Sequence, residues 1–182
     1  AAITEKMKEQ FGYVPVSHRA GRWAMNDTYF ELLYQYGYRI DCSYTPGISW
    51  RDSLGQTPGF AGPDYRKASR DIQKYKGIVE VPVTVEYTHR MFLDKNKSWK
   101  SNIKTALFGM AGQNIWLRPG RDNRKDMLWM IEKNRNGDGD YLMFMLHSSE
   151  LMPGGSPTFK DAEAVEVLYG KLQVLFDVIK DS

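Results

Sequence analysis

Cysteine is almost absent from this 182-residue sequence, and the single Cys42 excludes an internal disulfide. The chain therefore cannot be a small domain that is held together by disulfides. Long apolar runs are absent as well, because the longest, residues 141–146, is far short of the ~20 residues that cross a bilayer. We expect no transmembrane segment. Repeats and Pro/Gly/Ser linkers are also missing, which favours a single domain over residues 1–182.

A large excess of one charge is missing too. The chain has 25 Lys and Arg against 22 Asp and Glu, for a net charge of +3. A nucleic-acid-binding protein gathers its basic residues on one face, whereas here they are spread along the chain, and we expect no nucleic-acid partner. The densest basic cluster consists of Lys95, Lys97, Lys100 and Lys104 around Trp99. We interpret it as a solvated loop, with a site for an anionic partner such as nucleic acid as the alternative.

Common cofactor motifs do not occur. The sequence has no P-loop, no dinucleotide fingerprint and no paired-cysteine metal site. His18 and His89 have no partner at the spacing of metal ligands, so we assign no metal ligand in this chain.

Predicted strands and helices alternate along the sequence. Strands are expected at residues 13–18, 38–41, 78–87, 113–117 and 141–146, and helices at residues 3–11, 26–36, 122–134 and 165–179. The continuous apolar run at 141–146 indicates a strand buried on both faces. This alternation predicts a parallel α/β layer or barrel. The long Gly- and Pro-rich loop at 43–69 is expected to be functional.

Every predicted strand ends on charged or titratable residues, which in parallel α/β folds is where ligands bind. Asp41 beside His147 would raise the pKa of the imidazole and make it a general acid near neutral pH. Arg19 could position a second carboxylate or clamp an anionic group. Trp23 and Trp50 could form an aromatic platform for a sugar ring. The alternatives are ordinary structural roles: a satisfied histidine, a loop cap, a structural ion pair and core packing.

Three segments in order resemble the polysaccharide deacetylase family, carbohydrate esterase family 4. They are Arg19-Ala20-Gly21-Arg22-Trp23, then Asp41-Cys42-Ser43-Tyr44-Thr45-Pro46 with Trp50, and finally Leu146-His147-Ser148. They are similar to the family's three C-terminal motifs. Weaker matches favour a branch associated with bacterial surface polysaccharides such as O-antigen.

The resemblance implies a distorted (β/α) barrel and metal-assisted hydrolysis of an N-acetyl group from a sugar or polysaccharide. It implies that His147 protonates the leaving amine, that Asp41 pairs with His147, and that Arg19 holds the carboxylate of the catalytic base. It further implies that Trp23 and Trp50 wall the substrate groove. Leu146 would shape the acetyl pocket. Glycan assembly on a lipid carrier favours the cytoplasm, with export left open.

The family's first two motifs, which supply the base and the metal ligands, should lie upstream of Arg19. The 18 residues before Arg19 contain no aspartate and one histidine. We therefore expect a barrel that is incomplete at its N-terminal side. Its divalent metal, zinc or similar, would be held by an N-terminal part of the same enzyme, and this chain alone would not be competent. The alternative is a non-catalytic carbohydrate-binding relative.

Overall fold

The computed structural model describes residues 2–52, 61–89, 98–100, 103, 107, 112–120, 123–137 and 139–180. The chain divides into two compact units, Ala1–Val85 and Glu86–Ser182. Each unit has its own apolar core, and each is described by itself.

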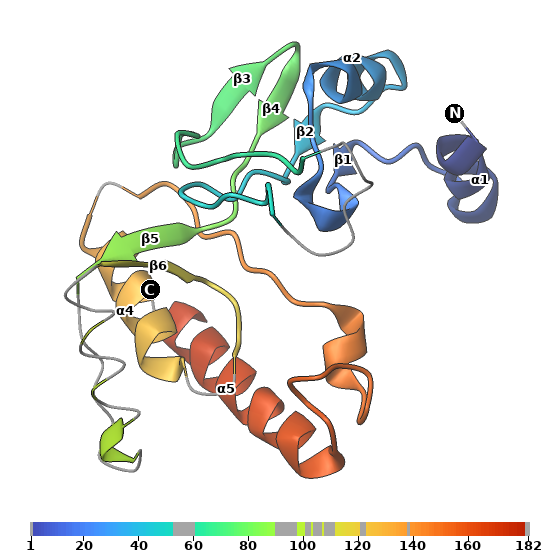
Figure 1. Cartoon of the computed structure of the whole chain (residues 1–182). Coiled ribbons are helices and arrows are strands. Elements are labelled where there is room, and N and C mark those ends of the chain that lie inside the picture. Colours follow the sequence, from blue (N-terminus) through green and yellow to red (C-terminus); the bar gives the residue numbers. More distant parts are fainter. Residues whose placement is uncertain are drawn as a thin grey trace. The chain divides into compact units, whose positions relative to one another are not determined.

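The first unit is built on a four-stranded sheet with the order β1-β2-β4-β3 (Figure 1). Strands β1 (Ser17–His18), β2 (Ile40–Asp41) and β4 (Ile78–Glu80) are parallel, and β3 (Gln73–Tyr75) is antiparallel to β4. Helices α1 (Ala2–Phe11) and α2 (Asp27–Gln35) and a short 3₁₀ turn, η1 (Gly21–Trp23), complete the unit. The parallel layer predicted from the sequence is confirmed for these three strands.

Local sequence explains where α2 begins and ends. The Asn26 side chain accepts a hydrogen bond from the Tyr29 backbone N–H at 2.9 Å and so caps the first turn. Gly37, with a φ of 89°, ends the helix in the left-handed conformation that glycine adopts without strain. The helix buries Phe30 and Leu33 in the core of this unit beside Ile78. The predicted helix at 26–36 is confirmed.

The strand predicted at residues 78–87 is in fact two strands. Residues 81–84, which include Pro82, lie in neither β4 nor β5 (Val85–Thr88), because proline cannot donate to a sheet ladder. The β3–β4 hairpin was not predicted. Its two-residue turn, Lys76-Gly77, has φ values of 48° and 82°, as tight hairpins require.

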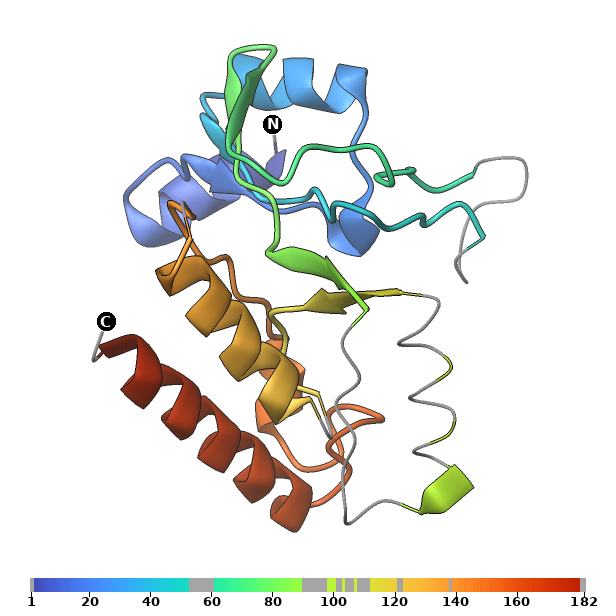
Figure 2. The same ribbon diagram turned by 90° about the vertical axis from the view of Figure 1, so that its left-hand side faces the viewer.

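The second unit contains β5 paired with β6 (Gln113–Trp116), helices α4 (Arg124–Arg135) and α5 (Ala162–Lys180), and the 3₁₀ turn η2 (Ser148–Leu151). Helices α4 and α5 lie side by side (Figure 2). Between them, Met127, Met130, Ile131 and Leu175 form a core with residues of β6.

The strand predicted at residues 141–146 is wrong. This segment lies outside the two sheets, and the Met145 N–H donates to the Leu117 carbonyl at 3.2 Å. Its apolar residues are partly covered by side-chain packing, and Phe144 packs against both the cluster that contains Leu175 and the cluster that contains Phe159. The described residues form one sheet of four strands and one sheet of two strands. The (β/α) barrel stays a prediction.

Two further features concern the expected partners. Of the lysine cluster, Lys100 is described, with its Nζ atom 5.8 Å from the centre of the Trp99 ring, while Lys95, Lys97 and Lys104 lie outside the described residues. Within the described part of the chain, no helix is long and apolar enough to span a membrane.

Candidate functional site

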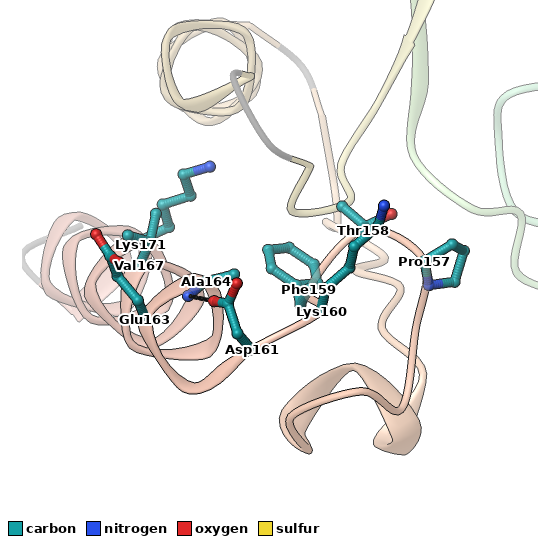
Figure 3. A pocket seen from close by; sticks show the side chains of 9 residues that line it. All are labelled: Pro157, Thr158, Phe159, Lys160, Asp161, Glu163, Ala164, Val167 and Lys171. Carbon is teal, nitrogen blue, oxygen red and sulfur yellow. Dashed lines mark hydrogen bonds between the residues drawn. The ribbon is translucent and has the colours of Figure 1, made fainter.

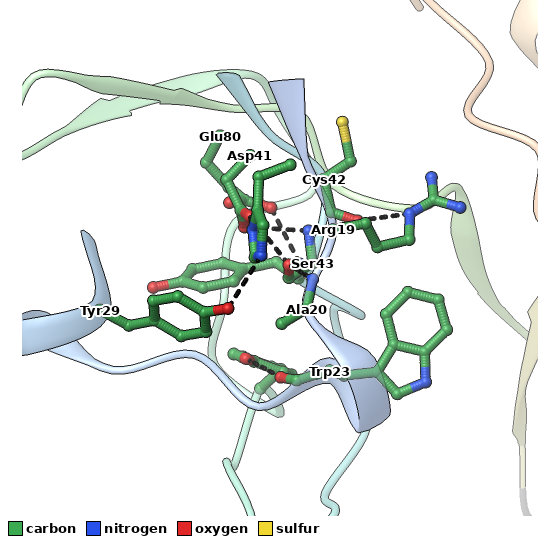
Figure 4. A network of polar contacts seen from close by, with 11 residues as sticks. Arg19, Ala20, Trp23, Tyr29, Asp41, Cys42, Ser43 and Glu80 are labelled. Carbon is green, nitrogen blue, oxygen red and sulfur yellow. Dashed lines mark hydrogen bonds and ion pairs between the residues drawn. The ribbon is translucent and has the colours of Figure 1, made fainter. Parts of the chain in front are cut away.

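Three titratable side chains lie next to one another at the carboxyl edge of the parallel strands (Figure 4). His18, Asp41 and Glu80 are the last residues of β1, β2 and β4. His18 pairs in register with Asp41, and Asp41 pairs with Glu80. Because residues paired across neighbouring strands project to the same face of the sheet, the register alone brings the imidazole and the two carboxyl groups together.

Asp41 is completely buried and accepts hydrogen bonds at both carboxylate oxygens. Its Oδ1 atom accepts from His18 Nδ1 at 2.7 Å and from Ser43 Oγ at 2.9 Å, and its Oδ2 atom accepts from the Ser43 backbone N–H at 3.0 Å. Burial by itself would raise the pKa of Asp41. The hydrogen bonds from His18, Glu80 and Ser43 outweigh the burial and hold this pKa below its ordinary value. Asp41 is therefore ionised at neutral pH.

His18 is held at both ring nitrogens. Since ionised Asp41 can only accept, His18 Nδ1 carries a proton and donates it to the carboxylate. His18 Nε2 lies 3.0 Å from the Tyr29 hydroxyl, and the rings of Tyr29 and Tyr38 pack edge-on against the imidazole at 5.1 and 5.9 Å. Burial, followed by the charge of Asp41, raises the pKa of Tyr29, so its hydroxyl stays protonated. The imidazole is thus fixed in one orientation.

Glu80 supplies the third titratable group and is also completely buried. Its Oε1 atom accepts from the Tyr44 backbone N–H at 2.9 Å. Burial, reinforced by the adjacent Asp41, raises the pKa of Glu80 to about 9. Within the described residues its Oε2 atom is buried and has no hydrogen-bond partner. Asp41 and Glu80 therefore share one proton, which stays on Glu80 at neutral pH.

An aromatic and basic surface follows directly after β1. The Trp23 and Trp50 rings lie nearly parallel, with centroids 6.3 Å apart and planes 21° apart. The guanidinium carbon of the exposed Arg19 lies 5.8 Å from the centre of the Trp23 ring, on the same side of the network in Figure 4. Arg19 Nε donates to the Cys42 carbonyl at 3.1 Å. We call the two tryptophans with Arg19 the tryptophan platform.

Hydrogen bonds from neighbouring residues hold the tryptophan platform in place. Trp50 Nε1 donates to Thr45 Oγ1 at 2.8 Å, and the Tyr65 hydroxyl donates to the Trp23 carbonyl at 2.5 Å. Arg22 and Trp23 have φ values of 55° and 60°, in the left-handed region that costs bulky residues about 1–2 kcal/mol each. Such strain persists where the surrounding structure imposes it and is often found at functional sites.

The structure brings together four of the six residues named from the sequence. Arg19, Trp23, Asp41 and Trp50 all lie in the first unit, whereas Leu146 and His147 lie in the second. The imidazole bonded to Asp41 is that of His18, and the pairing of Asp41 with His147 stays a prediction. Arg19 contacts a backbone carbonyl and an indole ring in the structure, and its predicted grip on a catalytic base also stays a prediction.

In the second unit, His147 is exposed and precedes η2. Its backbone N–H donates to Glu150 Oε2 at 2.9 Å, and the other oxygen of the buried Glu150 accepts from Arg118 Nη2 at 2.9 Å. Leu146 packs partly buried against the apolar cluster that contains Phe159 and Leu168. Glu150 therefore anchors the backbone of His147 and leaves the imidazole at the surface.

A cavity of about 610 Å³ also lies in the second unit, at the start of α5 (Figure 3). Asp161 caps this helix by accepting from the Ala164 backbone N–H at 2.8 Å. Lys171 Nζ donates to the Gly120 carbonyl at 2.5 Å. Acidic and basic side chains line the cavity together, so its walls do not favour a ligand of one charge.

The described residues do not fit a metal centre. No group of three or more His, Cys, Asp or Glu side chains in this part of the chain could hold a metal ion. Both nitrogens of His18 are engaged by Asp41 and Tyr29, and both oxygens of Asp41 accept hydrogen bonds.

Sequence reasoning missed the roles of His18, Ser43 and Glu80. A usable signal was present for two of them, because His18 and Glu80 end the strands that flank Asp41. No known protein family, no curated protein and no solved structure matches the chain.

Proposed function

We propose that the first unit binds an N-acetylated sugar at the tryptophan platform and belongs to a hydrolase of the polysaccharide deacetylase type, acting in cell-surface glycan biosynthesis. One observation carries the proposal. Arg19 with Trp23, Asp41 and Trp50 come from separate positions of the resemblance, and the fold gathers them at one edge of the sheet.

The platform supports the binding half of this proposal. Two nearly parallel indole rings offer a flat apolar surface, and Arg19 adds hydrogen-bond donors beside it. A sugar ring has an apolar face and a rim of hydroxyl groups, which matches such a combination. Since Thr45 already holds the Trp50 indole and Tyr65 holds the backbone of Trp23, little ordering accompanies binding.

The proton network supports the hydrolytic half. Hydrolysis of an amide requires a group that protonates the departing nitrogen, and an imidazole oriented by a buried carboxylate is suited to that role. His18 with Asp41 has this arrangement in the first unit, and because its Nε2 atom lies 3.0 Å from the Tyr29 hydroxyl, the proton would pass through that hydroxyl. His147, the general acid that the resemblance implies, is exposed and free of the sheet in the second unit. A divalent metal would activate water in such an enzyme, and its ligands are not assigned to the described residues.

A non-catalytic carbohydrate-binding protein is the second candidate. One observation favours it: the platform is complete within a single unit, whereas the residues implied for catalysis are divided between two. The two candidates share sugar binding and differ in acetate release.

Calorimetric titration of the full chain with a hexamer of N-acetylglucosamine tests the shared claim. We expect measurable binding that Trp23→Ala and Trp50→Ala each weaken at least tenfold, with Trp129→Ala in the second unit as the matched control. Absence of binding, or equal binding by all three variants, would overturn the proposal. Acetate release from the same oligomer, measured with and without added zinc, then separates the hydrolase from the binding protein.

A further inference from the structure

We propose that Tyr29, His18 and Asp41 form a proton relay that activates a water molecule, and that Tyr29 is the catalytic residue through which the first unit hydrolyses a carboxylic ester. This activity goes beyond the proposed function, because the relay needs neither a sugar on the tryptophan platform nor a metal ion. The hydrogen bonds and the exposure of the three side chains carry the proposal.

Two hydrogen bonds connect the three side chains in one line. His18 Nδ1 lies 2.7 Å from Asp41 Oδ1, and His18 Nε2 lies 3.0 Å from the Tyr29 hydroxyl. A neutral imidazole that carries its proton on Nδ1 can only accept at Nε2, so the Tyr29 hydroxyl donates to it. A hydroxyl bonded to an imidazole that a carboxylate orients is the arrangement by which hydrolases generate a nucleophile.

Exposure to solvent rises along this line from Asp41 to Tyr29. The Asp41 side chain is completely buried, the His18 side chain is 15% exposed, and Tyr29 is 36% exposed. Among the residues that the structure describes, His18 is the one hydrogen-bond partner of the Tyr29 hydroxyl, which points into the polar network in Figure 4. While this hydroxyl donates to His18, its oxygen can still accept from a water molecule at the surface.

Packing holds the hydroxyl and the imidazole in this geometry. The rings of Tyr29 and Tyr38 meet the His18 imidazole edge-on. Tyr29 also lies in the first turn of α2, where its backbone N–H donates to the Asn26 side chain at 2.9 Å. A relay whose members are already oriented loses little entropy when a substrate binds.

The charges in this row of the sheet favour proton uptake by His18. Burial and the adjacent Asp41 raise the pKa of Glu80 to about 9, so Glu80 is neutral and Asp41 carries the negative charge. That charge contacts the imidazole and stabilises the imidazolium that forms when His18 takes a proton. Since burial raises the pKa of Tyr29, its hydroxyl passes one proton on while it takes up another and does not become a free phenolate.

The reaction balances with water as the second reactant. The water oxygen attacks the carbonyl carbon of the ester while a water proton moves to Tyr29 Oη and the Tyr29 proton moves to His18 Nε2. The bond between the carbonyl carbon and the alcohol oxygen then breaks, and His18 returns its proton through Tyr29 to the departing alkoxide. A carboxylic acid and an alcohol are released. An ester fits this relay because an alkoxide departs more readily than the nitrogen of an amide.

The experiment follows hydrolysis of 4-nitrophenyl acetate by the full chain over many turnovers. We expect Tyr29→Phe, which keeps the ring beside His18, to lower the rate by at least about a hundredfold, the lower end of what general acid–base catalysis contributes. Tyr36→Phe removes the hydroxyl of an exposed tyrosine at the end of the same helix and should keep the parent rate. A metal chelator should also leave the rate unchanged.

Solvent isotope measurements distinguish a relay from a structural role of Tyr29. When two protons move together, the rate depends on the deuterium content of the water along a curve, whereas one moving proton gives a straight line. We expect a curve for the parent chain and a straight line for the residual activity of Tyr29→Phe. A straight line for the parent chain would overturn the relay. An acetyl group found on Tyr29 by mass spectrometry would do so as well, because Tyr29 would then be the nucleophile.

The remaining outcomes separate this inference from the proposed function. Turnover no faster than in buffer, equal rates in Tyr29→Phe and Tyr36→Phe, or a rate that falls with the chelator would overturn the relay. If Tyr29→Phe does not fold, as circular dichroism would show, the isotope measurement on the parent chain still decides. Sugar binding is measured separately by calorimetric titration, so either claim can fail while the other stands.

Discussion

His18 Nδ1 lies 2.7 Å from Asp41 Oδ1, and the two residues occupy paired positions on the neighbouring parallel strands β1 and β2. The pairing is a property of the backbone register, so neither side chain needs a long loop to reach the other. Asp41 in turn stands beside Glu80 on the next strand. One row of the sheet therefore holds an imidazole that is bonded to a carboxylate, the ionised acid Asp41 and the neutral acid Glu80.

Loss of the Asp41 charge should destabilise the first unit strongly. Asp41→Asn replaces one of the two acceptor oxygens by an NH2 group, so the side chain can no longer accept from His18 Nδ1–H, Ser43 Oγ–H and the Ser43 backbone N–H together, and we expect a buried donor left unsatisfied to cost about 3 kcal/mol of unfolding free energy. Urea unfolding followed by circular dichroism measures it. The control Asp71→Asn, at an exposed turn, should change the free energy by less than about 0.5 kcal/mol. Equal effects of the two variants would contradict the assigned role.

The pH dependence of stability should carry the signature of Glu80. Its folded pKa of about 9 lies above the ordinary value of 4.5, so the folded state holds a proton that the unfolded state releases between these pH values. Stability from this group is present below pH 4.5 and is lost as the pH rises toward 9. Asp41 acts oppositely, because its lowered pKa makes stability fall as the solution is acidified below about pH 4.

Replacing Glu80 by glutamine isolates that contribution. Glu80→Gln keeps the shape, donates from its amide to Asp41 and does not titrate, so the unfolding free energy should decline less between pH 5 and pH 8 than in the parent chain. Urea unfolding at the two pH values measures the difference. A decline of the same size in both proteins would show that Glu80 is ionised in the folded state.

Because the backbone at Arg22 is strained, a substitution there should raise the unfolding free energy, whereas most substitutions lower it. Arg22→Gly should raise the unfolding free energy by about 1 kcal/mol, because glycine adopts a φ of 55° without a Cβ clash. Thermal unfolding detects the change. Arg51→Gly, an exposed arginine on the other side of the platform, serves as the comparison and should not stabilise the chain.

Two glycines with similar backbones separate strain from steric collision. Gly12 and Gly77 have φ values of 74° and 82°, but a Cβ at Gly12 meets nothing within 4 Å, whereas a Cβ at Gly77 would come within 2.6 Å of the Tyr34 ring. Gly12→Ala should cost about 1 kcal/mol from backbone strain alone. Gly77→Ala should cost more, since Tyr34 must also move. Equal losses of stability in chemical denaturation would contradict the packing around the hairpin turn.

Local sequence patterns predicted helices better than strands. The cap at Asn26 and the stop at Gly37 are encoded within a few residues, and the helix between them is confirmed. The apolar run at 141–146 has the composition of a buried strand, yet packing against the clusters that contain Phe159 and Leu175 covers it in part without a ladder. Hydrophobicity indicates burial, and it cannot by itself distinguish burial in a sheet from burial under helices.

The two tryptophans of the platform were paired from the sequence, whereas the residues that hold Asp41 were not. Arg19 and Trp23 are four residues apart, and their proximity follows from one turn. The hydrogen bond between His18 and Asp41 depends on the pairing of β1 with β2, which no short-range signal specifies. The proton on Glu80 depends on complete burial beside a second carboxylate, which is likewise a tertiary property.

The central claim, that the tryptophan platform binds a sugar, is tested most directly by the indole N–H signals of the five tryptophans in a nitrogen-15 correlation spectrum. Each signal is assigned by a single substitution, and the full chain is titrated with the N-acetylglucosamine hexamer. We predict that the signals of Trp23 and Trp50 shift together with one dissociation constant while that of Trp129 in α4 stays in place. A spectrum in which neither Trp23 nor Trp50 responds to the sugar would contradict the account.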